Sequence, residues 1–177
     1  GTESFGYGND DIWLLKLDDD GSRVWSIAYG NTGDDEARAA VQTADGGFVV
    51  TGFTRSFGAS QSDAFVLRVD GAGGFLWMRR FGGTGDESGQ GVVELADGLA
   101  VAGWTDNFGS GSADMFLTKV STSGSLEWYR TYGGGSSDHD KALAKAKDGG
   151  LLLGGYSYSF DSGVRDLYLV KTTPDGS

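Results

Sequence analysis

Three sets of polar residues recur in this chain every 51 or 52 residues but change in chemical type from one copy to the next. The sets are Arg55, Asp106 and Tyr158; Glu36, Ser88 and His139; and Arg38, Gln90 and Lys141. In a repeat protein, residues kept in every copy serve the repeating unit, whereas residues that differ are available to contact a ligand. Such a mixture could line a polar groove or a channel mouth, although drift on a solvent-facing surface produces the same pattern.

No catalytic motif accompanies these residues. His139 is the single histidine, which excludes a multi-histidine metal site, and the chain has no Gly-x-Ser-x-Gly nucleophile motif. The acidic runs at 10–11, 18–20 and 34–36 offer oxygen ligands for Ca²⁺, but none has the spacing of a calcium loop, and turn formation explains them. We therefore expect no metal and no cofactor, with Ca²⁺ as the alternative, and the sequence favours a protein without catalytic activity.

The elements that must position these residues are marked by side chains that repeat unchanged. Asp11, Asp63, Asp114 and Asp166 each begin a similar apolar run, and Trp25, Trp77 and Trp128 recur at the same step. A fixed period near 50, made of short alternating apolar segments, is typical of propeller blades, because one such sheet cannot bury both of its faces alone. We interpret these residues as structural and expect each Trp to pack between adjacent sheets. The basic residues five positions after each Asp are expected to make structural contacts with Asp or to lie along a sheet edge: Lys16, Arg68, Lys119 and Lys171.

Each repeat contains four strand candidates, which in the central copy cover 89–96, 99–105, 114–120 and 126–132. We predict an all-β fold, a β-propeller of four-stranded antiparallel blades of 51–52 residues, with about three to three and a half blades in this chain. The expected domain is a single propeller over residues 1–177, partial or completed by oligomerisation, with blade parts at 4–30, 37–81, 89–132 and 140–173.

The connections alternate between tight and long. Asp-Gly pairs such as Asp45-Gly46 predict tight hairpins, whereas the segments 30–36 and 54–62 are longer. We expect the long connections to emerge together on one face. The third strand of each unit is apolar on both sides of its alternation, with Trp13, Leu15 and Leu17 on one side, so we expect it to be buried on both faces.

The run Ser-Asp-Ala-Phe-Val-Leu-Arg-Val-Asp, followed by a Gly turn, Leu-Trp, Phe-Gly-Gly-Thr-Gly-Asp-Glu and Ala-Gly-Trp-Thr, resembles the bacterial β-propeller repeat called the SBBP repeat. The resemblance covers almost the whole chain. It implies exported or cell-surface proteins, usually without an assigned activity, and a strand order that divides the chain into 2, 4, 4 and 3 strands, thirteen in all. Quinoprotein propellers also place Asp, a Gly turn and Trp at the end of each blade, but the Asp70 to Trp77 step is one residue shorter, which argues against a quinone cofactor.

Composition restricts the partners and the location. A formal net charge of −11 would repel a phosphate backbone, so we expect no nucleic acid partner. No apolar stretch is long enough to span a bilayer, so we expect no membrane insertion. The absence of Cys fits a secreted bacterial protein as well as a cytoplasmic one. With the SBBP resemblance, an acidic chain favours an extracellular or cell-surface location in a prokaryote.

Three functions fit these observations. The first is a non-enzymatic propeller scaffold or interaction module that binds protein or glycan through its long-loop face. The second is a glycan-active hydrolase or lyase that uses loop carboxylates. The third is a piece of a longer propeller with no activity of its own. The expected macromolecular partner is a second copy: in a two-fold homodimer, the C-terminal inner strands of one chain would join the N-terminal outer strands of the other, giving six blades and leaving Asp166 to Thr172 redundant.

Overall fold

The computed structural model describes residues 9–57, 59, 61–160 and 164–177, and these residues form an all-β chain. Among the described residues no helix is present, and so none could span a membrane. The strands are β1 (Ile12–Leu17), β2 (Arg23–Tyr29), β3 (Asp35–Gln42), β4 (Phe48–Thr54), β5 (Asp63–Val69), β6 (Phe75–Phe81), β7 (Glu87–Glu94), β8 (Gly98–Thr105), β9 (Asp114–Ser121), β10 (Leu126–Tyr132), β11 (Asp138–Lys145), β12 (Leu151–Ser157) and β13 (Asp166–Lys171). The prediction of an all-β fold is confirmed.

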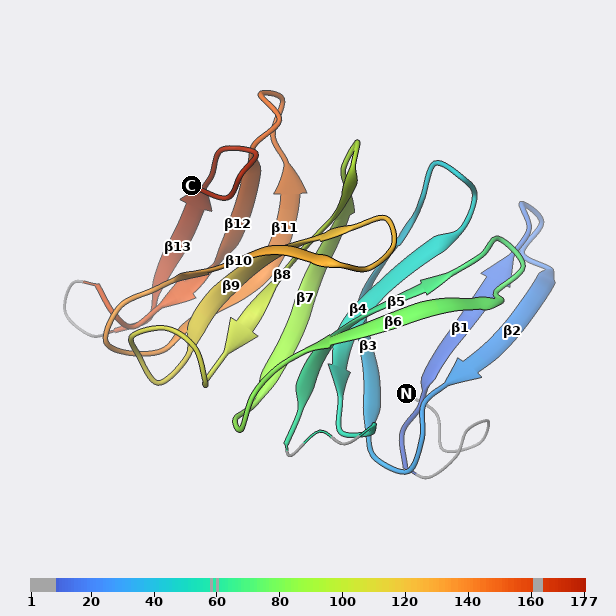
Figure 1. Cartoon of the computed structure of the whole chain (residues 1–177), viewed down its shortest axis with the longest axis horizontal. Coiled ribbons are helices and arrows are strands. Elements are labelled where there is room, and N and C mark those ends of the chain that lie inside the picture. The colour runs from blue at the N-terminus through green and yellow to red at the C-terminus, as the bar shows by residue number, and fades with distance from the viewer. Residues whose placement is uncertain (1–8, 58, 60, 161–163) are drawn as a thin grey trace.

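The strands form four antiparallel sheets in which sequence neighbours pair. The first sheet is β1–β2, the second β3–β6, the third β7–β10 and the fourth β11–β13. This division into 2, 4, 4 and 3 strands confirms the predicted count. In Figure 1 the sheets lie side by side along the long axis, with the first and fourth sheets at opposite ends. Residues 4–8 of the first predicted blade part lie outside the described residues.

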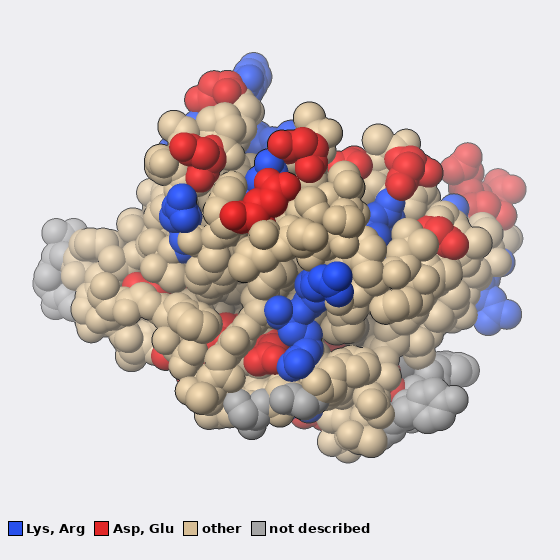
Figure 2. All heavy atoms as spheres, viewed as in Figure 1, with Lys and Arg blue, Asp and Glu red and all other residues tan. Residues whose placement is uncertain are grey.

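The tight turns and the long connections lie at opposite edges of this array. Gly46 in the β3–β4 turn has φ 83°, a left-handed conformation that glycine adopts without steric cost. The β3–β4, β7–β8 and β11–β12 turns are at the upper edge in Figure 1, and acidic side chains gather along this edge in Figure 2. The long connections meet as expected: the Arg55 backbone N–H donates to the Asp34 carbonyl at 2.8 Å.

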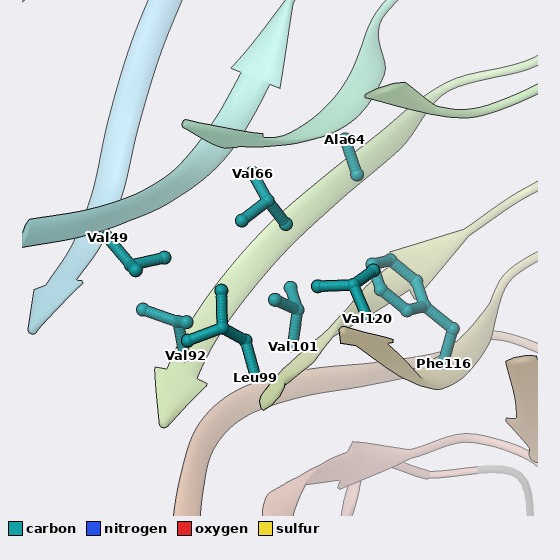
Figure 3. Packing of buried hydrophobic residues seen from close by; sticks show 8 residues of the cluster. All are labelled: Val49, Ala64, Val66, Val92, Leu99, Val101, Phe116 and Val120. Carbon is teal, nitrogen blue, oxygen red and sulfur yellow. The ribbon is translucent and has the colours of Figure 1, made fainter. Parts of the chain in front are cut away.

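The sheets pack on one another in a fixed direction. In each sheet, the residues one and three positions after the recurrent Asp lie on one face, and the residues two and four positions after it lie on the opposite face. The first of these faces packs on the second of these faces in the next sheet. Ile12 packs with Phe65 and Leu67 in this way, and Met115 and Leu117 pack with partly buried side chains of β13. Figure 3 shows the junction of the second and third sheets, where these side chains point toward one another: Val49, Ala64, Val66, Val92, Leu99, Val101, Phe116 and Val120. Each junction therefore repeats the same two-sided apolar contact.

The expectation that every third strand is buried on both faces holds for β5 but is wrong for β1. All seven residues of β5 are buried. In β1, Trp13, Leu15 and Leu17 are 44%, 42% and 48% exposed. Their sequence pattern matches that of β5, but no described sheet precedes the first sheet to cover this side.

The last segment is structured in the single chain. β13 pairs with β12 over six residues, and Tyr168 and Val170 pack against the core formed with the third sheet. Leu167 and Leu169 on the opposite face are 78% and 57% exposed. Within one chain this segment is therefore not redundant, although only one of its faces is covered.

The repeated Trp side chains connect successive sheets. The Trp25 indole N–H donates to the Gly71 carbonyl at 3.1 Å, and the Trp77 indole N–H donates to the Thr122 carbonyl at 3.2 Å. Trp128 lies against the turn at Gly176. Each ring packs on the tight turn of the following sheet, which ties the outer strands together.

The recurrent basic and acidic residues have structural surroundings. Each basic residue of the second, third and fourth sheets pairs with an Asp in a tight turn of its own sheet: Arg68 with Asp45 at 2.6 Å, Lys119 with Asp97 at 2.7 Å and Lys171 with Asp148 at 2.9 Å. The first sheet lacks that turn, and Lys16 instead donates to the Gly71 carbonyl at 3.4 Å. Asp11, Asp63 and Asp114 are buried where their strands begin, and Asp166 is half-buried.

Candidate ligand groove

A hollow of about 430 Å³ spans the second, third and fourth sheets, at the end of the strands away from the tight turns. We call it the central groove. Its lining consists of the basic residues Arg38, Arg55 and Lys141, the rings of Phe53, Trp104, Tyr156 and His139, and the smaller polar residues Ser62, Asp86, Ser88 and Gln90. Its size is that of a site for a small ligand.

The repeat explains why these residues meet. Inner strand β7 contacts β3 on one side and β11 on the other, so equivalent positions of the three strands converge. The pairings of β3 with β4, β7 with β8 and β11 with β12 each skip one residue, which is the extra residue of a β-bulge. These residues are Arg38, Gln90 and Lys141, respectively. A bulge turns its side chain out of the regular alternation. All three bulge residues line the groove.

A glycine beside each ring permits the bulge. A Cβ on Gly52 would lie 1.8 Å from the Glu36 carbonyl oxygen, and one on Gly155 would lie 1.9 Å from the His139 carbonyl oxygen. Only glycine allows the two backbones to approach this closely. The next residue, Phe53 or Tyr156, then presents its ring to the groove.

Three aromatic rings form a row across the third and fourth sheets. The centroid of His139 is 5.0 Å from that of Trp104, with the planes tilted by 54°, and 5.2 Å from that of Tyr156, with the planes at 25°. His139 is half-buried between these two rings. The row offers aromatic ring surfaces inside a polar groove.

Cationic groups lie over the Phe53 and Tyr156 rings of the groove. The guanidinium groups of Arg38 and Arg55 are 5.6 and 5.5 Å from the centroid of the Phe53 ring. The Lys141 ammonium is 5.7 Å and the Arg165 guanidinium 3.9 Å from the centroid of the Tyr156 ring. Cations within about 6 Å of a ring face are attracted by its negative quadrupole. The groove thus brings cations together in a chain whose net charge is −11. Two of these cations have carboxylate partners beside the groove: Arg38 pairs with Glu36, and Arg55 pairs with Asp34 at 2.9 Å.

The positive charge of the groove does not come from histidine. Burial lowers the pKa of His139, and the nearby Lys141 ammonium lowers it further. Since an ordinary histidine has a pKa of about 6.5, His139 is neutral at pH 7 and above. Its imidazole acts there as an aromatic ring and as a hydrogen-bonding group.

The structure brings some of the predicted residues together and places others elsewhere. Arg38, Arg55, His139 and Lys141 line the groove, as do Ser88 and Gln90. Glu36 lies at its margin, paired with Arg38 at 3.1 Å, and Tyr158 meets Tyr156 edge-on at 5.9 Å. Asp106 has a different place: its carboxylate accepts a hydrogen bond from the Asp86 backbone N–H at 2.6 Å.

Sequence reasoning missed the ring positions Phe53, Trp104 and Tyr156. All three copies have an aromatic residue at this position. The rule that residues kept in every copy serve the fold therefore excluded them from the candidate site. The available signal was the repeated Gly-aromatic pair at the end of each second strand.

The acidic run at 18–20 makes hydrogen bonds within its own turn. The Asp18 carboxylate accepts hydrogen bonds from the backbone N–H groups of Asp20 and Ser22, at 3.1 and 2.8 Å. Within the described part of the chain, no group of three or more His, Cys, Asp or Glu side chains is arranged to hold a metal ion.

Comparisons with known proteins support the fold more than the function. No family model matches the chain. It is 31% identical over 139 residues to the regulatory protein FlaEY of Caulobacter vibrioides, a match that covers 66% of this chain and 15% of that protein. The chain thus spans only a small part of the length of this curated relative. A crystal structure of a protein of unknown function from Bacteroides caccae matches 91% of this chain and 57% of its own, with a TM-score of 0.53 and 15% identity, which shows similarity of fold alone.

Proposed function

We propose that this chain forms blades of a β-propeller of the SBBP-repeat type and that its central groove binds an acidic oligosaccharide. Four successive antiparallel sheets with short hairpins and a repeated Trp contact support the propeller architecture. The observation that carries the ligand class is that cations and rings line one groove: Arg38 and Arg55 lie over Phe53, Lys141 lies over Tyr156, and Trp104 adds a further ring.

The cations, the rings and the short polar side chains of this lining each suit one part of an acidic sugar. Arginine presents a planar fork of donors that binds a carboxylate through two hydrogen bonds. The C–H faces of a sugar ring pack on flat rings such as Trp104, and the hydroxyl groups find partners in short polar side chains such as Ser88 and Gln90. A uronic acid unit combines all three features.

Binding without turnover is the form of this function that the lining favours. Glycoside hydrolysis by the usual mechanisms requires two carboxyl groups that flank the bond to be cleaved. Among the described residues that line the groove, Asp86 alone carries a carboxylate, and it accepts a hydrogen bond from the Ser62 backbone N–H at 3.0 Å. We therefore propose an interaction module rather than a hydrolase or lyase.

An exported setting agrees with this proposal. The SBBP-type repeat, the acidic composition and the absence of Cys all fit a secreted or cell-surface protein of a prokaryote, where acidic polysaccharides are accessible. A signal sequence on the parent gene and recovery of the protein from the cell surface would test the location.

Calorimetric titration with a short oligogalacturonate tests the ligand class. We expect binding that weakens at least tenfold in Arg38→Gln with Lys141→Gln, and no change in the control Arg23→Gln, which alters an exposed arginine on β2. Trp104→Ala should also lose binding while the circular dichroism spectrum is retained.

Three further ligands separate the alternatives. The methyl-esterified oligosaccharide, which lacks the charge, should bind weakly. Equal binding of a polyglutamate peptide would favour a protein ligand, and shortened products after incubation would favour a hydrolase or lyase. Failure of the oligogalacturonate to bind would contradict the proposal.

A further inference from the structure

The β1 edge of the first sheet borders a hollow. Among the described residues β1 pairs only with β2, whereas its counterparts β5 and β9 also pair with β4 and β8. A hollow of about 370 Å³ lies beside β1, lined by Leu14, Leu15 and Leu17 and by Ala40 and Val50 of the second sheet. The hollow thus lies between β1 and the strands β3 and β4 of the second sheet.

The tight turn of the first sheet differs from its counterparts, because no Trp side chain of the described residues lies against it. A Cβ on Gly73 would lie within 4 Å of Trp25, one on Gly124 within 4 Å of Trp77, and one on Gly176 within 4 Å of Trp128. The equivalent position on Gly21 has no described atom within 4 Å. The turn at Gly21 thus has the shape of a Trp-receiving turn and receives none.

Lys16 shows the same incompleteness. Its counterpart Lys171 pairs with Asp148, which belongs to the β11–β12 turn of the fourth sheet. Lys16 contacts no carboxylate among the described residues, because the first sheet has no hairpin that could supply one.

The fourth sheet supplies what the first sheet lacks. Among the described residues it consists of the inner strands β11 and β12 and of β13. Its third strand is a copy of β1: residues 166–177 read DLYLVKTTPDGS and residues 11–22 read DIWLLKLDDDGS. β13 therefore occupies the place on β12 that β1 has the sequence to occupy.

We propose that two copies of this chain associate by strand replacement, with β1 of each copy taking the place of β13 beside β12 of the other. Each of the two junctions would then be a four-stranded sheet in the order β11–β12–β1–β2. With the second and third sheets of each copy, the assembly would contain six four-stranded sheets. Leu15 and Leu17 would enter the positions of Val170 and Thr172, beside Met115 and Leu117 of the partner's third sheet. The turn at Gly21 would receive the partner's Trp128, and Lys16 would pair with the partner's Asp148.

The replacement is favoured because β1 brings a complete second face. Leu167 and Leu169 of β13 are 78% and 57% exposed, whereas Ile12, the equivalent of Leu167, is only 2% exposed, since the second sheet covers it. After replacement both faces of the strand are buried, and β1 is paired along its length with β12 of the partner.

Cysteine cross-linking tests the register directly, because the chain has no native Cys. Leu152 faces Lys171 across β12 and β13, so after replacement it should face the partner's Lys16. Directly opposed residues of antiparallel strands lie within disulfide range. We expect Lys16→Cys with Leu152→Cys to form, on mild oxidation, a covalent species of twice the chain mass. The matched control, Leu152→Cys with Lys171→Cys, should form an internal disulfide that holds β13 in place.

Light scattering completes the test. The unmodified chain should have twice the chain mass, and the oxidised control should have the mass of one chain. A dispersed single chain at high concentration without covalent dimer would overturn the proposal. A disulfide that forms within one chain of the Lys16→Cys, Leu152→Cys variant would also overturn it. A ladder of higher masses would contradict closure by two copies. Circular dichroism of every variant checks that the sheets are retained.

Discussion

The strands β5 and β1 have nearly the same apolar pattern but very different surroundings. β5 lies between two sheets and every one of its residues is buried, whereas β1 is covered on one face, and Leu15 on the other is 42% exposed. The local sequence thus specifies the strand, and the neighbouring sheets determine its burial. The difference between the middle and the ends of the array is therefore the property to test.

The largest effect is expected at the position two residues after the recurrent Asp. Phe65 is 0% exposed in the second sheet, and Phe65→Ala should cost about 3–5 kcal/mol of unfolding free energy because it leaves a cavity. Trp13→Ala, at the equivalent position of the first sheet, should cost only about 1 kcal/mol in dilute solution. Urea unfolding of both variants at low chain concentration measures the contrast. Equal losses would show that the ends are packed like the middle.

A buried carboxyl distinguishes the fourth sheet from the two middle sheets. The residue just before the bulge residue is Ala37 in β3, Gly89 in β7 and Asp140 in β11. Asp140 is 0% exposed. Its Oδ1 accepts a hydrogen bond from the Ala142 N–H at 3.3 Å, and Oδ2 has no donor among the described residues. Burial raises the pKa of Asp140 to about 7. In the unfolded chain the pKa of an Asp is about 4.

This shift makes stability fall as the pH rises. Between about pH 4 and pH 7 the folded chain holds a proton on Asp140 that the unfolded chain has lost, so each step up in pH favours unfolding. We expect Asp140→Asn to increase the unfolding free energy at pH 8 by on the order of 3 kcal/mol and to have little effect at pH 4. Urea midpoints across this range measure it, with the exposed Asp19→Asn as control. A gain that does not depend on pH would contradict the assignment.

A smaller effect should separate two turn glycines. Gly124 and Gly21 have φ values of 81° and 79°, so an Ala at either position carries the same backbone strain, about 1 kcal/mol. A Cβ on Gly124 would also lie 2.9 Å from the Trp77 ring, whereas one on Gly21 meets no described atom within 4 Å. Gly124→Ala should therefore cost about 2–3 kcal/mol and Gly21→Ala about 1 kcal/mol. Thermal unfolding compares them, and equal shifts would show that Trp77 does not rest on this turn.

Much of the fold was predictable from the sequence because it repeats. The step from Asp11 to Asp63 and onward marked the repeating unit of four strands. The division into thirteen strands followed from the resemblance to the SBBP repeat. The exposure of Leu15 could not be predicted, because the pattern of β1 is the same whether or not another sheet covers it.

The candidate site was only partly predictable. Arg38, Gln90 and Lys141 stood out because they differ between copies, but their direction depends on β-bulges that form only when the strands pair. Trp104 was missed because a repeated residue can serve both the fold and a ligand. Asp106 was assigned to the site because sequence position alone does not show that it contacts the neighbouring loop.

Hydrogen exchange measured strand by strand, at low and at high chain concentration, tests most directly the claim that neighbouring sheets, rather than local sequence, determine the burial of β1 and β13. At low concentration we predict slow exchange for β5 and β9 and faster exchange for β1 and β13. At high concentration β1 should gain protection while β13 loses it, because one strand replaces the other. Protection of β1 and β13 that equals that of β5 at low concentration, and does not change with concentration, would contradict the account.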